Sequence, residues 1–256
     1  MKENRIAIVT GATRGIGKQI ARELASSGIF VICTGRSGQK GAEVVESICQ
    51  QGGKAVFFAL DLSRPTSLDS FAEKVVKTYG RLDVLVHNAG ISGPMGPIES
   101  SPREEVEKVM QVNVQGVYLL TQRLIPLLKH SDSGRIVMVS SIACRLNPAH
   151  SGAYNMSKAA MNALAATLAK ELGPAGITVN TVAPGLVLTD RIRNERIPGM
   201  AQKAGISEEQ MQQSLTKDTL TNRLTTESDV ANAVAFLASE RASSVTGQVL
   251  NVSAGM

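Results

Sequence analysis

IAIVTGATRGIG, at residues 6–17, is the stretch from which the fold is predicted. Its first four residues, Ile6–Val9, form a continuous apolar run of the kind found in parallel strands that are buried on both faces. A glycine turn follows, and apolar residues then recur at helical spacing until Gly28, where a helix C-cap is expected. A strand, a glycine turn and a helix in this order predict the first unit of a doubly wound α/β fold.

The same alternation of strand and helix continues along the chain. Further strands are predicted at 29–34, 55–60, 84–86, 136–139, 177–182 and 249–252. Helices are predicted at 38–51, from Pro65 onward, at 103–129 with a break or kink at Pro126, at 153–173 and at 229–239. We therefore expect one α/β domain over residues 1–256, with a parallel sheet covered by helices on both faces.

Residues 190–223 are the only irregular insertion in this pattern. They are polar, rich in Met and Gln, and only weakly periodic. We interpret them as a cap over a substrate site, or else as a long surface excursion.

The composition of the 256 residues argues against several classes of protein. A hydrophobic content of 43% suits a large core, and no apolar stretch approaches the ~20 residues that span a membrane. Aromatic residues make up 3% and the net charge of +5 is scattered, so no nucleic-acid partner is expected. Three widely spaced cysteines argue against disulfides and a metal site. Because the N-terminus is polar and lacks a signal sequence, we predict a soluble cytoplasmic protein.

The glycine turn has the features of a phosphate site. In an open α/β sheet, ligands bind at the carboxyl ends of the strands, and this turn joins the first strand to the N-terminus of a helix. Glycines let the backbone approach a pyrophosphate, and the helix N-terminus supplies amide donors. The spacing of Gly11, Gly15 and Gly17 differs from the common dinucleotide fingerprint, but its position between strand and helix favours binding over a plain turn.

The second strand ends in Thr34-Gly35-Arg36-Ser37, without the acidic residue that binds the ribose 2′-hydroxyl of NAD. Arg36 and Arg14 are expected on either side of that ribose and are suited to a 2′-phosphate, which favours NADP. The alternative for each arginine is a solvated surface charge. Asp61, after the third strand, is expected to accept from the adenine amino group or simply to begin a helix.

Tyr154 and Lys158 lie one turn apart on the predicted helix at 153–173, with Cβ atoms ~5–6 Å from each other. A free tyrosine, with a pKa of about 10, is a poor acid–base catalyst at neutral pH. A nearby ammonium group favours the phenolate and lowers that pKa, which suits the pair to proton transfer. Taken alone, such a pair is more often a surface tyrosine beside a solvated lysine.

Several short motifs in a fixed order make the whole chain resemble the short-chain dehydrogenase/reductase family. They are Thr10-Gly11-Ala12-Thr13-Arg14-Gly15-Ile16-Gly17, Asn88-Ala89-Gly90, Asn113, Ser141, Tyr154-x-x-x-Lys158, and Pro184-Gly185 with Thr189. The resemblance implies a single-domain Rossmann fold of about seven parallel strands, a nicotinamide cofactor, and interconversion of a carbonyl compound with an alcohol. Members are commonly homotetramers, so a homotetramer is expected, paired through the helices at 113–129 and 154–173 and through the last strand.

The resemblance also implies roles for individual residues. Tyr154 is the expected general acid in ketone reduction, and Lys158 is expected to lower its pKa and to bind the nicotinamide ribose. Ser141 is expected to hold the substrate oxygen, and Asn113 to bind a water that links Lys158 to solvent. The expected NADP(H)-binding residues are Gly11, Thr13, Arg14, Gly15, Ile16, Gly17, Arg36, Ser37, Asp61, Leu62, Asn88, Ala89, Gly90, Tyr154, Lys158, Pro184, Gly185, Val187 and Thr189.

Some residues differ from the family pattern, and others lie close to its motifs in the sequence. His87 stands where many relatives have asparagine and is expected to be a structural contact. Ala175 stands where 3-oxoacyl-carrier-protein reductases often have arginine, which weakens the case for docking of an acyl carrier protein. Cys144 and His150 are expected to line the substrate pocket, in preference to forming a nucleophilic pair.

The expected function is NADPH-dependent reduction of a small-molecule ketone. A 3-oxoacyl thioester is the favoured substrate, because the chain resembles 3-oxoacyl-acyl-carrier-protein reductases most. One alternative is an alcohol or sugar dehydrogenase that works in the oxidative direction. Another is a non-catalytic NADP(H)-sensing protein, but such proteins usually lose the tyrosine or the lysine that this sequence keeps.

Overall fold

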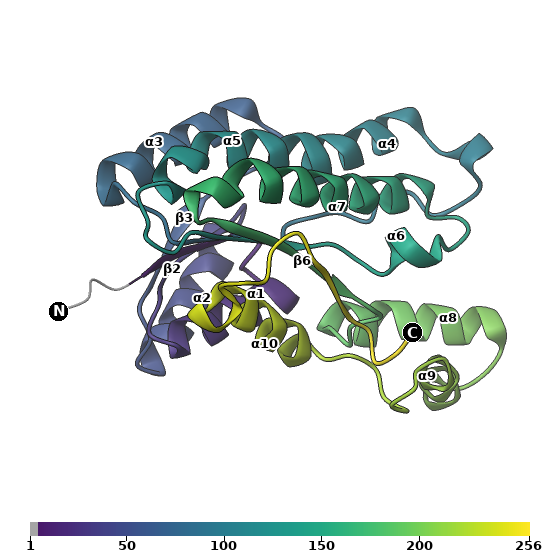
Figure 1. Ribbon diagram of the computed structural model, residues 1–256. Coiled ribbons are helices and arrows are strands. Elements are labelled where there is room, and N and C mark those ends of the chain that lie inside the picture. Colours follow the sequence, from purple (N-terminus) through teal and green to yellow (C-terminus); the bar gives the residue numbers. More distant parts are fainter. Residues whose placement is uncertain (1–4) are drawn as a thin grey trace.

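A sheet of seven parallel strands runs through the protein, with helices on both of its faces (Figure 1). The computed structural model describes residues 5–256; residues 1–4, the start of the N-terminal segment in which no signal sequence is predicted, lie outside the described residues. The strand order is β3-β2-β1-β4-β5-β6-β7. The strands are β1 Ile6–Val9, β2 Phe30–Gly35, β3 Ala55–Ala59, β4 Val84–His87, β5 Arg135–Val139, β6 Thr178–Pro184 and β7 Val249–Val252. This arrangement confirms the predicted Rossmann fold, whose strand order reverses between β1 and β4.

The core is divided by the sheet into two clusters. Successive strand residues point to opposite faces, so Ile8 belongs to one cluster while Ala7 and Val9 belong to the other. Helices α3, α5 and α7 cover the first face, and α1, α2 and α10 cover the second (Figure 1). The helices are α1 Gly15–Ser26, α2 Gly38–Gln50, α3 Pro65–Tyr79, α4 Arg103–Met110, α5 Gly116–Leu128, α6 Ala143–Leu146, α7 Gly152–Leu172, α8 Ile197–Ala204, α9 Glu208–Lys217 and α10 Glu227–Ala238.

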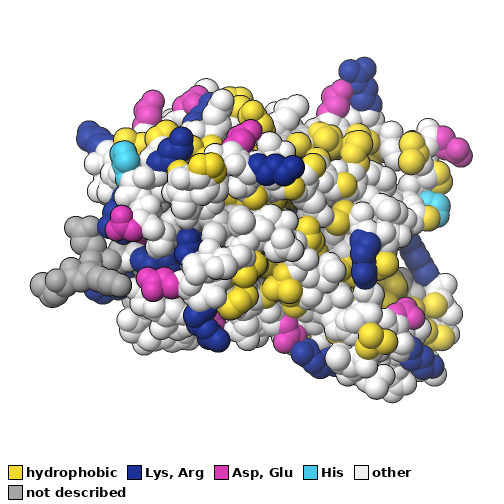
Figure 2. All heavy atoms as spheres, viewed as in Figure 1, with side chains coloured by type: hydrophobic (Ala, Val, Ile, Leu, Met, Phe, Trp, Pro, Cys, Tyr) yellow, Lys and Arg dark blue, Asp and Glu magenta, His cyan; other side chains and the backbone are white. Residues whose placement is uncertain are grey.

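The described residues also contain five short helices of other types. Three are 3-10 turns, at Ile98–Ser100, Gly173–Ala175 and Glu240–Ala242, and two are π-helices, at Gln111–Gln115 and Ile192–Arg196. Among residues 5–256, no helix is long and apolar enough to cross a membrane. On the face drawn in Figure 2, lysine and arginine side chains are dispersed among carboxylates and do not form a continuous stripe.

The prediction of a break at Pro126 was wrong. The π-helix at Gln111–Gln115 separates α4 from α5 instead, and Pro126 lies inside the last turn of α5. The flanking Leu124 and Leu127 are buried in the core, and this packing holds the helix across the hydrogen bond that proline removes. Helix α10 begins two residues earlier than predicted, because Thr226 and Asp229 form a capping box.

The prediction of an irregular segment at 190–223 was also wrong, because the π-helix Ile192–Arg196, α8 and α9 occupy most of it. We call residues 190–223 the cap. Its helices pack around a small cluster of their own, with Ile197, Ala201 and Met211 buried. So few apolar positions leave only a weak helical periodicity in the sequence.

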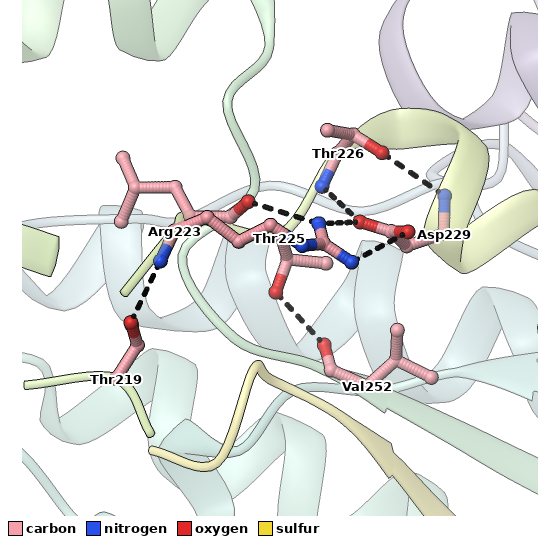
Figure 3. A network of polar contacts seen from close by, with 7 residues as sticks. Thr219, Arg223, Thr225, Thr226, Asp229 and Val252 are labelled. Atoms are coloured by element: carbon pink, nitrogen blue, oxygen red, sulfur yellow. Dashed lines mark hydrogen bonds and ion pairs between the residues drawn. The ribbon is translucent and has the colours of Figure 1, made fainter. Parts of the chain in front are cut away.

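The end of the cap is fastened to the domain by charged and polar contacts (Figure 3). The Arg223 guanidinium binds both carboxylate oxygens of Asp229, at 2.6 and 3.2 Å, which is the main reason that the pKa of Asp229 is lowered to about 2. Thr225 Oγ1 donates to the carbonyl of Val252 at 3.4 Å. The bonds of Arg223 connect the cap to α10, and the bond of Thr225, just after the cap, connects the chain to β7.

The glycine turn is held against the end of β4 by hydrogen bonds. Asn88 Nδ2 donates to the carbonyls of Thr10, at 2.9 Å, and Gly11, at 3.2 Å. The backbone N–H groups of Asn88 and Ala89 donate to Thr10 Oγ1, at 2.9 and 3.0 Å. A Cβ atom on Gly17 would collide with the Gly11 carbonyl and with Asn88 Nδ2. Glycine at position 17 is therefore required by the close approach of α1 to the turn.

We predict that Gly17→Ala lowers the free energy of unfolding by about 3 kcal/mol, because backbone atoms must move to admit the methyl group. Chemical denaturation of the two proteins measures this difference. Gly38→Ala is the matched control, since a Cβ at Gly38 meets nothing within 4 Å. Equal stability of the Gly17 and Gly38 variants would contradict the packing constraint.

Candidate active site

A cavity of about 690 Å³ opens at the carboxyl ends of β4, β5 and β6. Its walls come from the loops that follow these strands, from the start of α7 and from the cap. It brings together the following predicted site residues: Ile16, Asn88, Gly90, Ser141, Tyr154, Lys158, Pro184, Gly185, Val187 and Thr189. Asn113 lies outside this lining, on the π-helix Gln111–Gln115, and the other predicted residues lie at the glycine turn and at the ends of β2, β3 and β4.

Tyr154 and Ser141 both line the cavity, close enough for Ser141 to affect the pKa of the Tyr154 phenol. Burial raises the pKa of the Tyr154 phenol, while the hydrogen bond with Ser141 and the charge of Arg196 act to lower it. Ser141 Oγ also accepts from the backbone N–H of Ala143 at 3.1 Å. That bond orients the Ser141 hydroxyl and leaves its own proton available for donation.

Lys158 is buried below this pair. Its Nζ lies 5.7 Å from the centre of the Tyr154 ring, donates to the carbonyl of Val139 at 2.9 Å and contacts Met161 Sδ at 3.5 Å. Burial lowers the pKa of Lys158 to about 8. An ammonium group has three donors, so this lysine keeps capacity to bind a further acceptor. The sequence predicts that Lys158 lowers the Tyr154 pKa, but in this structure burial raises that pKa, and the groups that act to lower it are Ser141 and Arg196.

Asn113 lies on the π-helix Gln111–Gln115 and is fully buried. Its Oδ1 accepts from the backbone N–H of Ile91 at 2.9 Å. Its Nδ2 donates to the Ile91 carbonyl at 2.8 Å and to Ser157 Oγ at 3.0 Å. Asn113 therefore fastens the loop after β4 to α7, and both of its side-chain donors are already used.

The glycine turn fits the pyrophosphate of a dinucleotide. Gly11 and Gly15 have φ angles of +66° and +56°, a conformation that glycine adopts without strain. Among the described residues, no side chain caps the N-terminus of α1, and its first turn contains no acidic residue. The first amide groups of α1 are therefore free to donate to a phosphate.

Two arginines and one carboxylate were predicted near the adenosine end of the cofactor: Arg36 follows β2, Arg14 lies in the glycine turn and Asp61 follows β3. Arg36 and Arg14 are exposed, and neither forms an ion pair with another residue in the part of the chain that the structure describes. Burial tends to raise the pKa of Asp61, but hydrogen bonds from Ser63 and the charges of Arg36 and Arg64 lower it. Asp61 Oδ1 accepts from the backbone N–H and the hydroxyl of Ser63, at 3.0 and 2.7 Å, as expected of a residue that precedes a helix.

Three further predicted cofactor residues have structural contacts of their own. Ser37 caps α2 by accepting from the Lys40 backbone N–H at 3.4 Å. The Thr13 side chain packs against Gly35, where a Cβ atom would not fit. The Leu62 side chain is buried in the core, so only its backbone faces a ligand site.

The prediction that Cys144 and His150 line the pocket was wrong, because neither belongs to the cavity walls. Cys144 Sγ donates to the Ser141 carbonyl at 2.9 Å and accepts from Asn162 Nδ2 at 3.0 Å, so it is held against α7. His87 is buried, contacts Thr121 Oγ1 through Nε2 at 2.8 Å, and has its pKa lowered by burial to about 3. His87 is a structural contact, as expected.

Sequence reasoning missed the cap residues that line the cavity, above all Arg191, Ile192, Glu195 and Arg196. The signal available was a group of arginines directly after the predicted site residue Thr189. It also missed Thr10, whose hydroxyl holds the turn to β4. In residues 5–256, no group of three or more His, Cys, Asp or Glu side chains is placed to hold a metal ion.

Comparison with known proteins agrees with this geometry. Residues 11–256 match the family model described as enoyl-(acyl carrier protein) reductase. An uncharacterized oxidoreductase of Methylorubrum extorquens is 38% identical over 255 residues, which are 99% of this chain and 98% of the relative. The 3-oxoacyl-acyl-carrier-protein reductase of Haemophilus influenzae is 36% identical over 255 residues, with the same coverage of 99% and 98%.

A solved structure shows the same fold. The crystal structure of a variant of actinorhodin polyketide ketoreductase with NADPH matches with a TM-score of 0.92 and 30% identity, and covers 99% of this chain and 97% of that chain. Because the match covers 99% of this chain, it includes the sheet and the segments that form the strand-end cavity. The protein belongs to the short-chain dehydrogenase/reductase family and is an oxidoreductase that acts on carbonyl or alcohol groups with a nicotinamide cofactor.

Proposed function

We propose that the protein is an NADPH-dependent reductase that converts a ketone to a secondary alcohol, with 3-oxoacyl thioesters as the favoured substrates. The observation that carries this proposal is that Ser141, Tyr154 and the buried Lys158 line one strand-end cavity, with Lys158 Nζ 5.7 Å from the centre of the Tyr154 ring. The named reductase from Haemophilus influenzae supports the choice of thioester. NADPH in the actinorhodin ketoreductase structure supports the choice of cofactor.

Proton transfer is the work of Tyr154 and Ser141. The bound cofactor supplies a hydride, and the developing alkoxide then needs a proton and a hydrogen-bond donor. Ser141 donates to the substrate oxygen, since its acceptor side is already bound to Ala143. Tyr154 gives up its phenolic proton to the same oxygen, and the phenolate is stabilised by the ammonium of Lys158.

Lys158 and Asn113 return the proton to Tyr154 in this proposal. Beyond its contacts with Val139 and Met161, Lys158 Nζ has one donor left, which would bind the nicotinamide ribose or a water molecule. Because the Asn113 side chain is bonded to Ile91 and Ser157, the backbone carbonyl of Asn113 is the group that would hold this water. A π-helix shifts carbonyl groups out of the regular ladder, and such helices are frequent at functional sites.

Two alternatives remain distinct from this proposal. An alcohol or sugar dehydrogenase would use the same residues in the oxidative direction, with Tyr154 as base. A non-catalytic NADP(H)-sensing protein would not need the Ser141–Tyr154 pair or a buried lysine, so the retained site argues against it.

We also propose that the protein is a homotetramer. Tyr118 on α5 and Met156 on α7 are exposed apolar side chains on one side of the molecule, and Val249 and Leu250 are exposed on the edge strand β7. An edge strand with exposed apolar residues is a surface that proteins usually cover.

We predict that Tyr154→Phe reduces kcat for ketone reduction about a thousandfold, because the ring is retained and only the acidic proton is lost. NADPH consumption measures the rate, and quenching of protein-bound NADPH fluorescence measures cofactor binding. Tyr118→Phe, on the exposed surface of α5, is the matched control. Normal turnover by the Tyr154 variant would remove Tyr154 from the mechanism.

Replacing Arg36 with Ala should raise KM for NADPH about tenfold and leave KM for NADH nearly unchanged, because only NADPH carries the 2′-phosphate. Initial rates with each cofactor, at saturating ketone, give both constants. If the variant weakens both cofactors equally, Arg36 does not bind a 2′-phosphate.

The pH dependence should differ between the two directions of the reaction. Burial raises the pKa of Tyr154, so the phenol stays protonated through neutral pH and ketone reduction should be level from about pH 6 to about pH 8. Alcohol oxidation needs the phenolate, so its kcat should rise with pH over the same range. Lys158 has a pKa of about 8 and therefore also titrates near this pH range. The measured pH profile thus reflects the titration of both Tyr154 and Lys158. A flat profile for oxidation would contradict Tyr154 as the proton carrier.

A further inference from the structure

We propose that Arg196 selects ketone substrates that carry an anionic group, a carboxylate or a phosphate, on the part of the molecule distant from the carbonyl. The inference rests on the proposed reductase function and names the class of its substrates. It follows from the composition of the cavity walls, the pairing of their charges, and the place of Arg196 in the cap.

The walls of the cavity near Tyr154 are largely apolar. Met95 comes from the loop after β4, while Leu146 and Pro148 come from the segment between β5 and α7. Ile192, the first residue of the cap's π-helix, also lines the cavity. An apolar channel of this kind suits the aliphatic part of a substrate and offers nothing to a charged end group.

The charged side chains that line the cavity are Lys158, Arg191, Glu195 and Arg196. Lys158 is buried and bonded to the Val139 carbonyl. Glu195 has the only carboxylate side chain among the described lining residues, and it pairs with Arg191 at 3.6 Å. Arg196 has neither an ion pair nor a side-chain hydrogen bond within residues 5–256. The cap therefore presents one uncompensated guanidinium to the cavity.

Arg196 is also placed where a substrate can reach it. Burial raises the pKa of Tyr154, but the charge of Arg196 acts against that effect, so the guanidinium is within electrostatic range of the phenol. The next residue, Ile197, is buried in the cluster of the cap and fixes the backbone at this position. A carbonyl bound at Tyr154 and an anion bound at Arg196 can thus belong to one extended molecule.

A guanidinium suits this task because it remains charged at all working pH values and binds carboxylate or phosphate with two parallel hydrogen bonds. Arg196 is exposed, so the strength of the contact depends on how far the bound substrate excludes water from the guanidinium. A second possibility is that Arg196 acts only through Tyr154, by stabilising the phenolate. That role would change kcat and the pH profile for every substrate alike.

Two matched pairs of probes separate these roles. The first pair is 5-oxohexanoate and its methyl ester, which differ in a carboxylate. The second is the acetoacetyl thioester of 4′-phosphopantetheine and the acetoacetyl thioester of pantetheine, which differ in one phosphate. The variants are Arg196→Gln, Arg196→Lys, which keeps the charge, and Lys203→Gln, which removes an exposed charge from α8 outside the cavity.

Arg196→Gln should raise KM about tenfold for the anionic member of at least one pair and change KM for its neutral member less than about twofold. Arg196→Lys should restore much of the loss, and Lys203→Gln should match the wild type. The pair that responds tells whether the anion is a carboxylate or a carrier phosphate. If Arg196→Gln changes both members of both pairs equally, the inference is overturned while the reductase function stands. If the wild type reduces none of the four probes with NADPH, the proposed function itself fails.

Discussion

Parallel strands end at the same edge of a sheet, and the candidate site depends on that constraint more than on any single contact. Ser141 follows β5, Pro184 ends β6, and Asn88 follows β4, although these residues are far apart in the sequence. The reversal of strand order between β1 and β4 opens a crevice at this edge, next to the N-terminus of α1. The glycine turn completes the crevice because Thr10 and Asn88 fasten it to the end of β4. The chain thereby places the candidate phosphate site and the candidate proton-transfer site side by side.

Burial then gives the side chains at this edge their chemistry. Burial lowers the pKa of Lys158. Burial of the Tyr154 side chain raises the pKa of its phenol, so the phenol keeps its proton. A phenol that keeps its proton is a suitable acid for an alkoxide that forms beside it. The guanidinium of Arg196 offsets part of the effect of burial on Tyr154 and adds a positive charge on the substrate side of the cavity. Electrostatics from the cap and burial by the sheet thus act on the same hydroxyl group.

Strong local patterns made most of the fold predictable from the sequence. The buried strands are continuous apolar runs. Gly11, Gly15 and Gly17 lie between a strand and a helix, where a phosphate-binding turn is expected. The rest depended on contacts that no local pattern records. The π-helix at Gln111–Gln115 has ordinary helical residues, and the bonds of Asn113 to Ile91 and Ser157 fix its place. The cap folds around only three buried residues, so its periodicity is weak. Cys144 lies between Ser141 and Tyr154 in the sequence, yet a turn of α6 directs it to Asn162. Proximity in sequence was therefore a poor guide to which side chains face the cavity.

In the proposed reaction, a ketone bound at the strand-end site receives a hydride at its carbonyl carbon and a proton at its oxygen. Mass spectrometry of the alcohol formed from an acetoacetyl thioester and NADPH labelled with deuterium at the transferable C4 position tests it most directly. We expect one deuterium on the former carbonyl carbon of every product molecule, and none at that carbon when unlabelled NADPH is used in D₂O. Deuterium at that carbon from the solvent, or no alcohol product at all, would contradict the account.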